Sequence, residues 1–562
     1  MKKITILLLA ITFYTASYSQ TPLPNQLQEF LAAIDNCLLT NPVDGLCTNS
    51  QYGEMPDWDV SSVTDMQQAF ANKENFNADI SQWNVSNVSI MRNMFFGAHS
   101  FNQDITGWNT ANVSVMDQMF YEAYVFNQSI GTWDTSNVID MYYMFYEASA
   151  FDGDISSWNV SNVTNMASMF NGASSFNQPI GSWQTNSVAN MEKMFNSATS
   201  FNQSLNDWDT SSVTNMQAMF NNASVFNQSL NGWDTSNVVN MIKVFYEASA
   251  FDGDISNWDT SNVSDMRSLF RGASVFNGDI GSWDVSNVTD MTEFFYAAAA
   301  YNQQLNDWDT SNVTIMLDMF AGASAFNQSL NNWDTSNVTS MYGMFAEASI
   351  FNGDITDWDV SSVTDMTYMF FRANNFNQPL NDWDIGNVIY TTNMFAEASA
   401  FNGDISSWDI SSVTNMGSMF SLSGFSTNNY DAILNSWSQQ DVQSGVVLGA
   451  FGVNYCNGAD ARQSLEDNNG WIITDAGLDC STASIDDQNQ LDISIYPNPT
   501  SDIVYIDGNY TQLKVIIYNV LGKEILNKSI TNSIDISHLD NGVYILQLSD
   551  GVKLSTRKII KN

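Results

Sequence analysis

Residues 151–175 read FDGDISSWNVSNVTNMASMFNGASS, and segments of the same length and pattern run before and after them without a gap. A tryptophan recurs at every 25th position from Trp58 to Trp408, which gives fifteen copies of one unit. A fixed period of this length is typical of a solenoid, in which each unit stacks on its neighbours. The repeat therefore predicts the architecture of most of the chain, and it argues against a conventional active site.

Several positions of the repeat hold the same residue type in every copy. Valine recurs from Val63 to Val413, phenylalanine from Phe70 to Phe420, and alanine from Ala98 to Ala398. Identity between copies of one chain indicates that each copy meets the same environment, as stacking requires. We therefore assign these columns, together with the tryptophans and methionines, to the core.

The spacing within one copy predicts a short helix. Apolar residues lie at offsets that place them on one helical face: Val163, Met166, Met169, Phe170 and Ala173. Thr164 or Asn165 is the expected N-cap, and Gly172 lies near the other end. Upstream, the apolar residues of 155–160 predict a short strand and its turn.

A coil of 25 residues with one strand and one helix falls in the leucine-rich-repeat range of roughly 20–29 residues. We therefore expect an α/β solenoid of the leucine-rich-repeat kind, with one short strand and one short helix in each of about fifteen coils. A parallel β-helix remains the alternative.

Two polar columns have both a structural and a functional interpretation. An asparagine ladder, which includes Asn102, Asn127 and Asn177, is expected to bond backbone groups or its own neighbours. A second column holds aspartates that could bind calcium, and other copies place Ser, Pro or Gln there: Asp79, Asp104, Asp154, Asp254, Asp279, Asp354 and Asp404. These interruptions argue against a regular metal ladder, so no cofactor is expected, with calcium as the alternative.

The columns that vary between copies give the candidate binding face. They lie between the buried methionines and just after the invariant phenylalanine, and they contain these aromatic residues: Phe96, Tyr121, Tyr142, Tyr143, Tyr146, Tyr246, Tyr296, Tyr368 and Phe371. We expect them to project away from the core. Exposed aromatics on a regular scaffold are what a binding face uses, although single surface aromatics are also common.

The net charge and the histidine content narrow the range of functions that the chain could have. The net charge of −43 opposes binding to nucleic acid and to anionic membranes. The chain has two histidines, His99 and His538, and neither lies in a motif of nucleophilic catalysis. Two carboxylates suffice for glycoside hydrolysis, but a regular stack provides no deep cleft to separate their pKa values. We therefore expect a protein that is not an enzyme.

The ends of the chain have a different character from the repeats. Residues 1–20 have the charged start, short apolar run and small residues of a signal peptide, and no later stretch is apolar enough to span a membrane. Residues 21–51 and 426–482 are predicted to cap the repeats of 52–425. The first cap contains a helix near Leu27–Ile34. The second contains a helix, a strand and a helix at 429–437, 446–456 and 459–468.

The four cysteines flank the repeats, and none lies within them. In an exported chain this favours two local disulfides, Cys37–Cys47 and Cys456–Cys480. Metal binding is the rival interpretation, but the spacings match no zinc pattern.

The tail is a separate small domain. After a linker at 483–490, residues 491–562 contain short β-rich segments, including Ile503–Ile506, Leu513–Tyr518 and Val543–Leu548, which predict an all-β sandwich. This part holds seven acidic and seven basic residues, so the whole negative charge lies upstream.

Both parts resemble known families. The motif W-D-x-S-N-V-T-x-M-x-x-M-F-x-x-A resembles the repeats of BspA-like leucine-rich-repeat surface proteins. The tail resembles the C-terminal sorting domain of the type IX secretion system through these residues: Tyr496, Pro497, Asn498, Pro499, Gly522, Gly542 and Tyr544. The resemblances imply export by the type IX machinery to the outer surface of a Gram-negative bacterium, or secretion from it. Adhesion and protein binding are the roles that the repeat family implies.

The leading hypothesis is thus a non-catalytic binding or adhesion scaffold for a protein or glycan ligand. The alternative is a structural surface-layer or matrix protein, stabilised by calcium or without it.

Overall fold

The computed structural model describes residues 22–48, 50–481, 493–508, 510, 512–519, 523–550 and 554–562. The chain divides into two compact units between Gly477 and Leu478. The signal peptide and the linker that the sequence predicts lie outside the described residues. None of the helices in the described ranges combines the length and apolarity needed to cross a bilayer.

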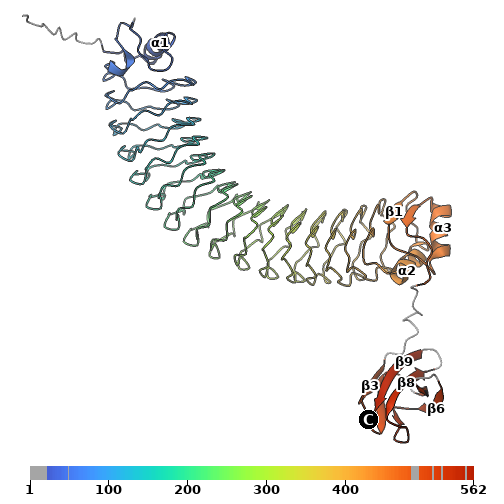
Figure 1. Ribbon diagram of the computed structural model, residues 1–562. Helices are drawn as coiled ribbons and strands as arrows, with labels where there is room; N and C mark the ends of the chain where they lie inside the picture. The colour runs from blue at the N-terminus through green and yellow to red at the C-terminus, as the bar shows by residue number, and fades with distance from the viewer. Residues whose placement is uncertain are drawn as a thin grey trace, which may run out of the picture. The chain divides into compact units, whose positions relative to one another are not determined.

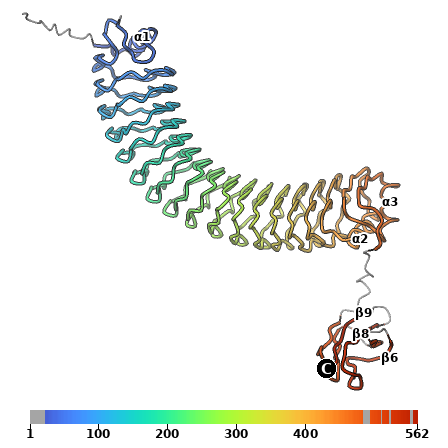
Figure 2. The backbone as a smooth tube through the Cα atoms, in the orientation of Figure 1, coloured from blue at the N-terminus to red at the C-terminus, as the bar shows by residue number. Residues whose placement is uncertain are grey.

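In the first unit the repeats form coils that stack one upon the next (Figures 1 and 2). Each coil pairs with the following one through a single parallel β-bridge between residues 25 apart, from Asp65–Ile90 to Tyr390–Asn415. The sequence period therefore equals one complete coil.

The interior of the coil differs from the sequence prediction. Residues 155–160 contain no strand, and residues 163–173 form consecutive turns where a helix was expected. The bridge residue is Asn165, which was predicted as a helix N-cap. Its side-chain Oδ1 does accept the backbone N–H of Ala167 at 3.1 Å, so the capping interaction is present but begins a turn.

Backbone hydrogen bonds explain why no helix forms. Alternate N–H groups, those of Met166, Ser168, Phe170 and Gly172, donate to carbonyls of the next coil at 2.7–3.0 Å. Of the intervening N–H groups, that of Ala167 donates to Asn165 Oδ1, and those of Met169, Asn171 and Ala173 donate to carbonyls three residues earlier in the same coil. This alternation requires left-handed backbone at Ser168 and Gly172, with φ of 54° and 74°, and a helix does not tolerate that conformation. Every N–H from Met166 to Ala173 is satisfied by stacking, by turns or by the Asn165 side chain, so a helix offers no additional bonds there.

The core consists of ladders of identical side chains. In every copy from Trp83 to Trp408, the indole Nε1 donates to a carbonyl 28 residues earlier, at 2.7–3.3 Å. Phenylalanine rings also stack from coil to coil: Phe220 lies 5.6 Å from Phe195 and 5.7 Å from Phe245 between ring centroids. The expected core columns are thus confirmed as buried.

The asparagine ladder is structural, as expected. The Oδ1 of each residue in this column accepts the backbone N–H one coil later, without interruption from Asn77 to Ser426, at 2.7–3.0 Å. Asp152 and Asp252 occupy two steps of the ladder and accept in the same way. The column therefore stabilises the stack through its oxygen atom.

Caps close both ends of the stack. At the first end lie α1 (Leu27–Leu38), which buries Phe30 and Ile34, and the short 3-10 helix η1 (Met55–Asp57). At the other end α2 (Thr427–Trp437) and α3 (Ala459–Asn469) accompany β1 (Val447–Ala450) and β2 (Ile472–Asp475), which pair in parallel. The N–H of Met416 donates to Val447, so β1 continues the ladder of the coils. The three cap helices lie where the sequence predicts them, whereas β2 was not predicted.

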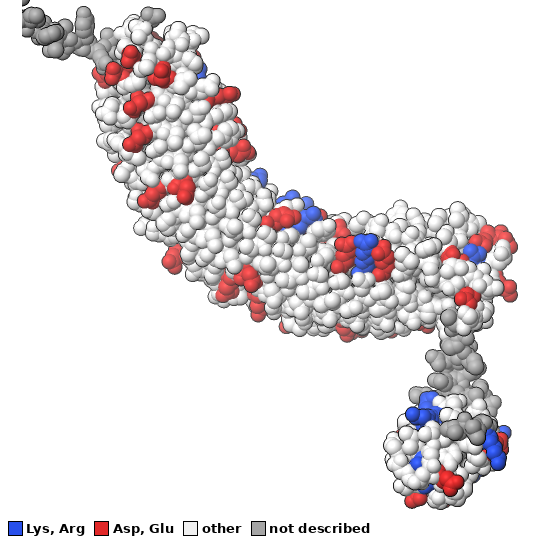
Figure 3. Space-filling model, in the orientation of Figure 1, with Lys and Arg blue, Asp and Glu red and all other residues white. Residues whose placement is uncertain are grey.

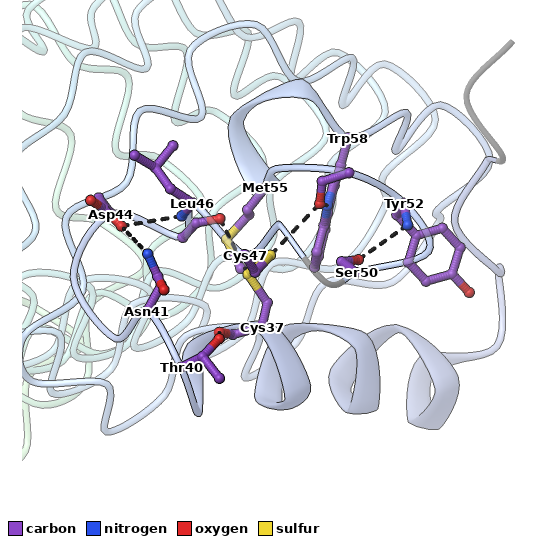
Figure 4. Close-up of a disulfide and its surroundings, with 12 residues drawn as sticks. Cys37, Thr40, Asn41, Asp44, Leu46, Cys47, Ser50, Tyr52, Met55 and Trp58 are labelled. Atoms are coloured by element: carbon purple, nitrogen blue, oxygen red, sulfur yellow. Dashed lines mark hydrogen bonds between the residues drawn. A yellow bond between two sulfur atoms is a disulfide. The ribbon is translucent and has the colours of Figure 1, made fainter. Parts of the chain in front are cut away.

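Both predicted disulfides are present. Cys37 and Cys47 are bonded within the first cap and are buried (Figure 4). Cys456 and Cys480 are also disulfide-bonded, and no described cysteine is free. Since the chain has four cysteines, these two pair with each other.

The second unit contains two antiparallel sheets. One has the order β3-β4-β7 and comprises Ile493–Tyr496, Ile503–Gly508 and Ser533–Asp535. The other has the order β6-β5-β8-β9 and comprises Glu524–Ile530, Leu513–Asn519, Gly542–Ser549 and Leu554–Lys561. Residues from both sheets share one buried cluster that includes Val504, Val515 and Leu546. Strands β6 and β9 were not among the predicted segments.

Candidate binding face

We call "variable face" the side chains at four positions of each coil: the two between the methionine columns and the two after the invariant phenylalanine. In the coil of 151–175 these are Ala167, Ser168, Asn171 and Gly172. The flanking Met166, Met169 and Phe170 point into the core and are fully buried. In this coil Ala167, Ser168 and Asn171 are small or short side chains and are buried. The residues at the same positions of most other coils are half-buried and reach solvent in part.

All nine predicted aromatic residues lie on this face, and all are half-buried rather than exposed. The reason is contact with neighbours in adjacent coils. Phe96, Tyr121 and Tyr146 occupy one position in three successive coils, and their rings stack with centroids 4.3 and 4.5 Å apart. Tyr143 lies 5.0 Å from Tyr146, and Tyr142 lies 4.1 Å from Tyr143. These five rings form one contiguous patch, which we call the aromatic cluster.

Acidic side chains accompany the aromatic cluster. Burial, followed by the charges of Tyr146 and Glu122, raises the pKa of Tyr121 to about 12. Burial and the hydrogen bond with Tyr143 raise the pKa of Tyr142 to about 12. Both hydroxyls are therefore protonated at neutral pH, and that of Tyr142 is engaged with Tyr143.

A second group of residues is built around Arg271. Its guanidinium carbon lies 3.9 Å from the ring centroid of Tyr296 and 5.5 Å from that of Tyr246, and its Nε donates to the Tyr246 hydroxyl at 3.2 Å. Glu293 pairs with Arg271 at 2.6 Å. Lys243 lies 5.1 Å from the ring of Tyr246. Arg271 thus joins Tyr246 and Tyr296. The sequence predicted the two tyrosines for this face but not the arginine.

A third group contains the last two predicted residues. Tyr368 lies 5.4 Å from Phe371 and 5.8 Å from Tyr342. Arg372 covers the ring of Phe371 at 4.7 Å and pairs with Glu347 and Glu397 at 3.0 and 2.8 Å. Tyr342 was not predicted, although its position beside a core methionine would have identified it. Within the described ranges, no ring contact joins the three groups.

Six of the seven basic residues of the repeats of 52–425 lie on the variable face, and the seventh is Lys73. Every lysine and arginine between residues 74 and 425 occupies one of its four positions: Arg92, Lys193, Lys243, Arg267, Arg271 and Arg372. On the side of the repeats seen in Figure 3, basic side chains are few and lie beside acidic ones. Ion pairs on an exposed surface stabilise a fold little. These ion pairs therefore contribute little to the stability of the coils.

The aspartate column considered for calcium has a local role. The Oδ1 of Asp79, Asp154 and Asp404, for example, accepts the backbone N–H two residues later at 2.9–3.0 Å. Across the part of the chain that the structure describes, no three His, Cys, Asp or Glu side chains form a group that could hold a metal ion.

Four overlapping parts of the chain match one protein family, described as Mycoplasma protein of unknown function, DUF285. The matched residues are 44–152, 126–233, 223–333 and 325–437, which together cover well over half of the chain. The chain belongs to the DUF285 family. The matched residues include all coils and the beginning of the second cap. Among curated proteins, no relative matches the chain.

Residues 494–562 match a second family, the secretion system C-terminal sorting domain. This tail implies recognition by the type IX secretion system and export as a secreted or surface protein. Its predicted motif residues are placed as follows. Asn498 donates to the carbonyl of Lys558 and accepts the N–H of Ile560, both at 2.8 Å. The segment thus binds the outer edge of β9, an edge that would otherwise be free to pair.

Two further residues of the sorting motif have visible roles. Gly542 begins β8, and Tyr544 is buried, with its hydroxyl donating to the carbonyl of Asp540 at 2.9 Å. Tyr496 is half exposed. Gly522 lies outside the described residues.

Proposed function

We propose that this chain is an exported, non-catalytic binding protein whose variable face holds a protein or glycan ligand, either at the cell surface or after release. In this proposal the stacked coils act as a solenoid scaffold. The observation that carries it is the aromatic cluster: five rings from three coils lie together and remain half exposed, in the columns that vary. Aromatic residues that keep part of their surface in solvent are common at the centres of binding sites.

Three further observations support the proposal. The sorting domain implies that the face meets an extracellular environment. The resemblance to BspA-like surface proteins suggests adhesion. The difference between invariant core columns and variable face columns is what repeat scaffolds show when they bind ligands along one surface.

The test is ligand capture by the full mature chain from host, bacterial and polysaccharide ligand arrays. The triple variant Tyr142→Ala, Tyr143→Ala, Tyr146→Ala is expected to lose binding at least about tenfold, because it removes most of the aromatic cluster. Alanine is compatible with the left-handed backbone at Tyr143, since Ala218 occupies the corresponding position with φ of 53°.

A matched control removes exposed apolar side chains elsewhere on the coils. Ile139 and Val239 are 54% and 51% exposed and lie outside the variable face, so the pair Ile139→Ala, Val239→Ala should leave capture unchanged. Equal binding by the triple variant and by the unmodified chain would remove the aromatic cluster from the proposal. Failure of the unmodified chain to capture any ligand would count against the function itself.

A further inference from the structure

An open cavity of about 520 Å³ lies at the first end of the aromatic cluster, within the range of roughly 300–1,000 Å³ common for ligand sites. Phe96 lines it, and the coils contribute Gln68, Asn72, Asn93 and Gln118. Helix α1 contributes Leu31 and Asp35. The site is therefore formed jointly by the first cap and the first three coils.

Phe96 is the last ring of the stack. Its plane is inclined by 8° to that of Tyr121, with centroids 4.3 Å apart, so Tyr121 covers one ring face. The coil before it carries Ala71 at the corresponding position, and no described ring lies on that side of Phe96. Tyr121 lies between two stacked rings, whereas Phe96 has a stacked ring on one face and lines the cavity.

The four amide side chains are unengaged. Those of Gln68, Asn72 and Gln118 make no hydrogen bond to another described residue, and Asn93 Oδ1 is buried without a partner. The structure uses amides differently elsewhere, because the asparagine ladder engages its oxygen atoms in every coil. A buried amide oxygen without a partner is costly unless a ligand or water satisfies it.

The lining of the cavity offers an ionic ligand no unpaired charge. Lys73 and Asp35 pair with each other at 2.6 Å, and the remaining polar groups are neutral amides. The net charge of −43 further repels anions. A ligand for this site is thus flat and apolar on one face, uncharged, and rich in hydrogen-bonding groups at its edge.

We propose that this cavity binds a hexose unit of a neutral glycan, with the sugar ring stacked on Phe96 and its hydroxyls bonded by the four amides. This inference rests on the proposed function and names one ligand class for it. A sugar hydroxyl both donates and accepts, so it satisfies amide N–H and C=O groups alike.

The experiment measures binding of the full mature chain to malto-, cello-, laminari-, manno- and chitohexaose by calorimetry. At least one is expected to bind. Phe96→Ala should weaken it about tenfold or more, since stacking on a ring is a main source of contact. Asn93→Gly should weaken it several-fold through the lost amide.

Both variants introduce residues that the chain already has at the equivalent positions of other coils. Ala71 and Gly343 stand at the positions equivalent to Phe96 and Asn93, and Gly343 has φ of 58° where Asn93 has 54°. Ile139→Ala and Val239→Ala remove exposed side chains outside the variable face and should leave saccharide binding unchanged.

Two results would overturn the assignment: no hexasaccharide bound at millimolar concentration, or equal losses in the Phe96 variant and in the Ile139 and Val239 variants. If the unmodified chain captures a polypeptide through Tyr142, Tyr143 and Tyr146 but no saccharide, the glycan inference falls and the binding function stands. If it captures neither, both fall.

Discussion

Each coil has a constant part and a variable part, built from the same short segment. Met166, Met169 and Phe170 repeat in the core, whereas Ala167, Ser168, Asn171 and Gly172 between and after them vary from copy to copy. Stacking explains the difference: a core side chain meets its own equivalent in both neighbouring coils, so one residue type suits every step. A side chain on the variable face keeps part of its surface toward solvent in most coils, so several residue types fit there.

The largest effect is expected from breaking the constant part. Phe220→Ala should lower the free energy of unfolding by about 3–5 kcal/mol, because the ring is fully buried and stacked on three others, among them Phe226. Denaturant unfolding of the full chain measures it. Gln217→Ala in the same coil, on the variable face, is the control and should change stability by less than about 0.5 kcal/mol. Similar losses in both variants would contradict the division into two parts.

The asparagine ladder is expected to show an intermediate effect. Asn177→Ala removes the oxygen that accepts the N–H of Asn202 at 3.0 Å. This change should lower the free energy of unfolding by about 1–2 kcal/mol. Asn177→Asp is the control, since Asp152 already serves as an acceptor in the same ladder. The aspartate variant should therefore retain most of the stability in thermal unfolding. Equal loss in both would show that the amide nitrogen, and not the oxygen, matters.

A smaller gain is expected where the constant part is already imperfect. Tyr301 stands in a phenylalanine column, is fully buried, and has a hydroxyl without a partner. Tyr301→Phe should therefore raise the free energy of unfolding by about 1 kcal/mol. Phe326→Tyr, which introduces the same hydroxyl one coil later, should lower it. If Phe326→Tyr instead raises the free energy of unfolding, this phenylalanine column accommodates a hydroxyl.

The smallest effect is a pH dependence on the variable face. Burial, with a contribution from Glu293, raises the pKa of Asp318 from 3.8 to about 6, against the opposing charge of Arg271. Between these two values the folded chain retains a proton that the unfolded chain releases, so this group lowers stability as pH rises from about 4 to 6. Asp318→Asn should flatten that part of the stability curve, measured by unfolding at several pH values. An unchanged slope would remove Asp318 as its source.

Much of the architecture could be predicted because period and burial are encoded locally. The 25-residue register, the core columns, the cap helices and the cysteine pairs follow from spacing and residue type. The helix within each coil could not be excluded in this way. Val163, Met166, Met169, Phe170 and Ala173 have the spacing of a helical face, and a coil that turns repeatedly around a core produces the same spacing. The residues with positive φ, such as Ser168, decide between the two, and they vary in type.

For the candidate site, the sequence determined which columns vary and which aromatics they carry. Only the tertiary structure decided that Phe96, Tyr121 and Tyr146 stack, that Tyr246 and Tyr296 share Arg271, and that Phe96 ends its stack beside a cavity. The physical reason is that these contacts join residues one or more whole coils apart. The period fixes which residues are neighbours, whereas side-chain packing and α1 fix which ring faces and amides remain free.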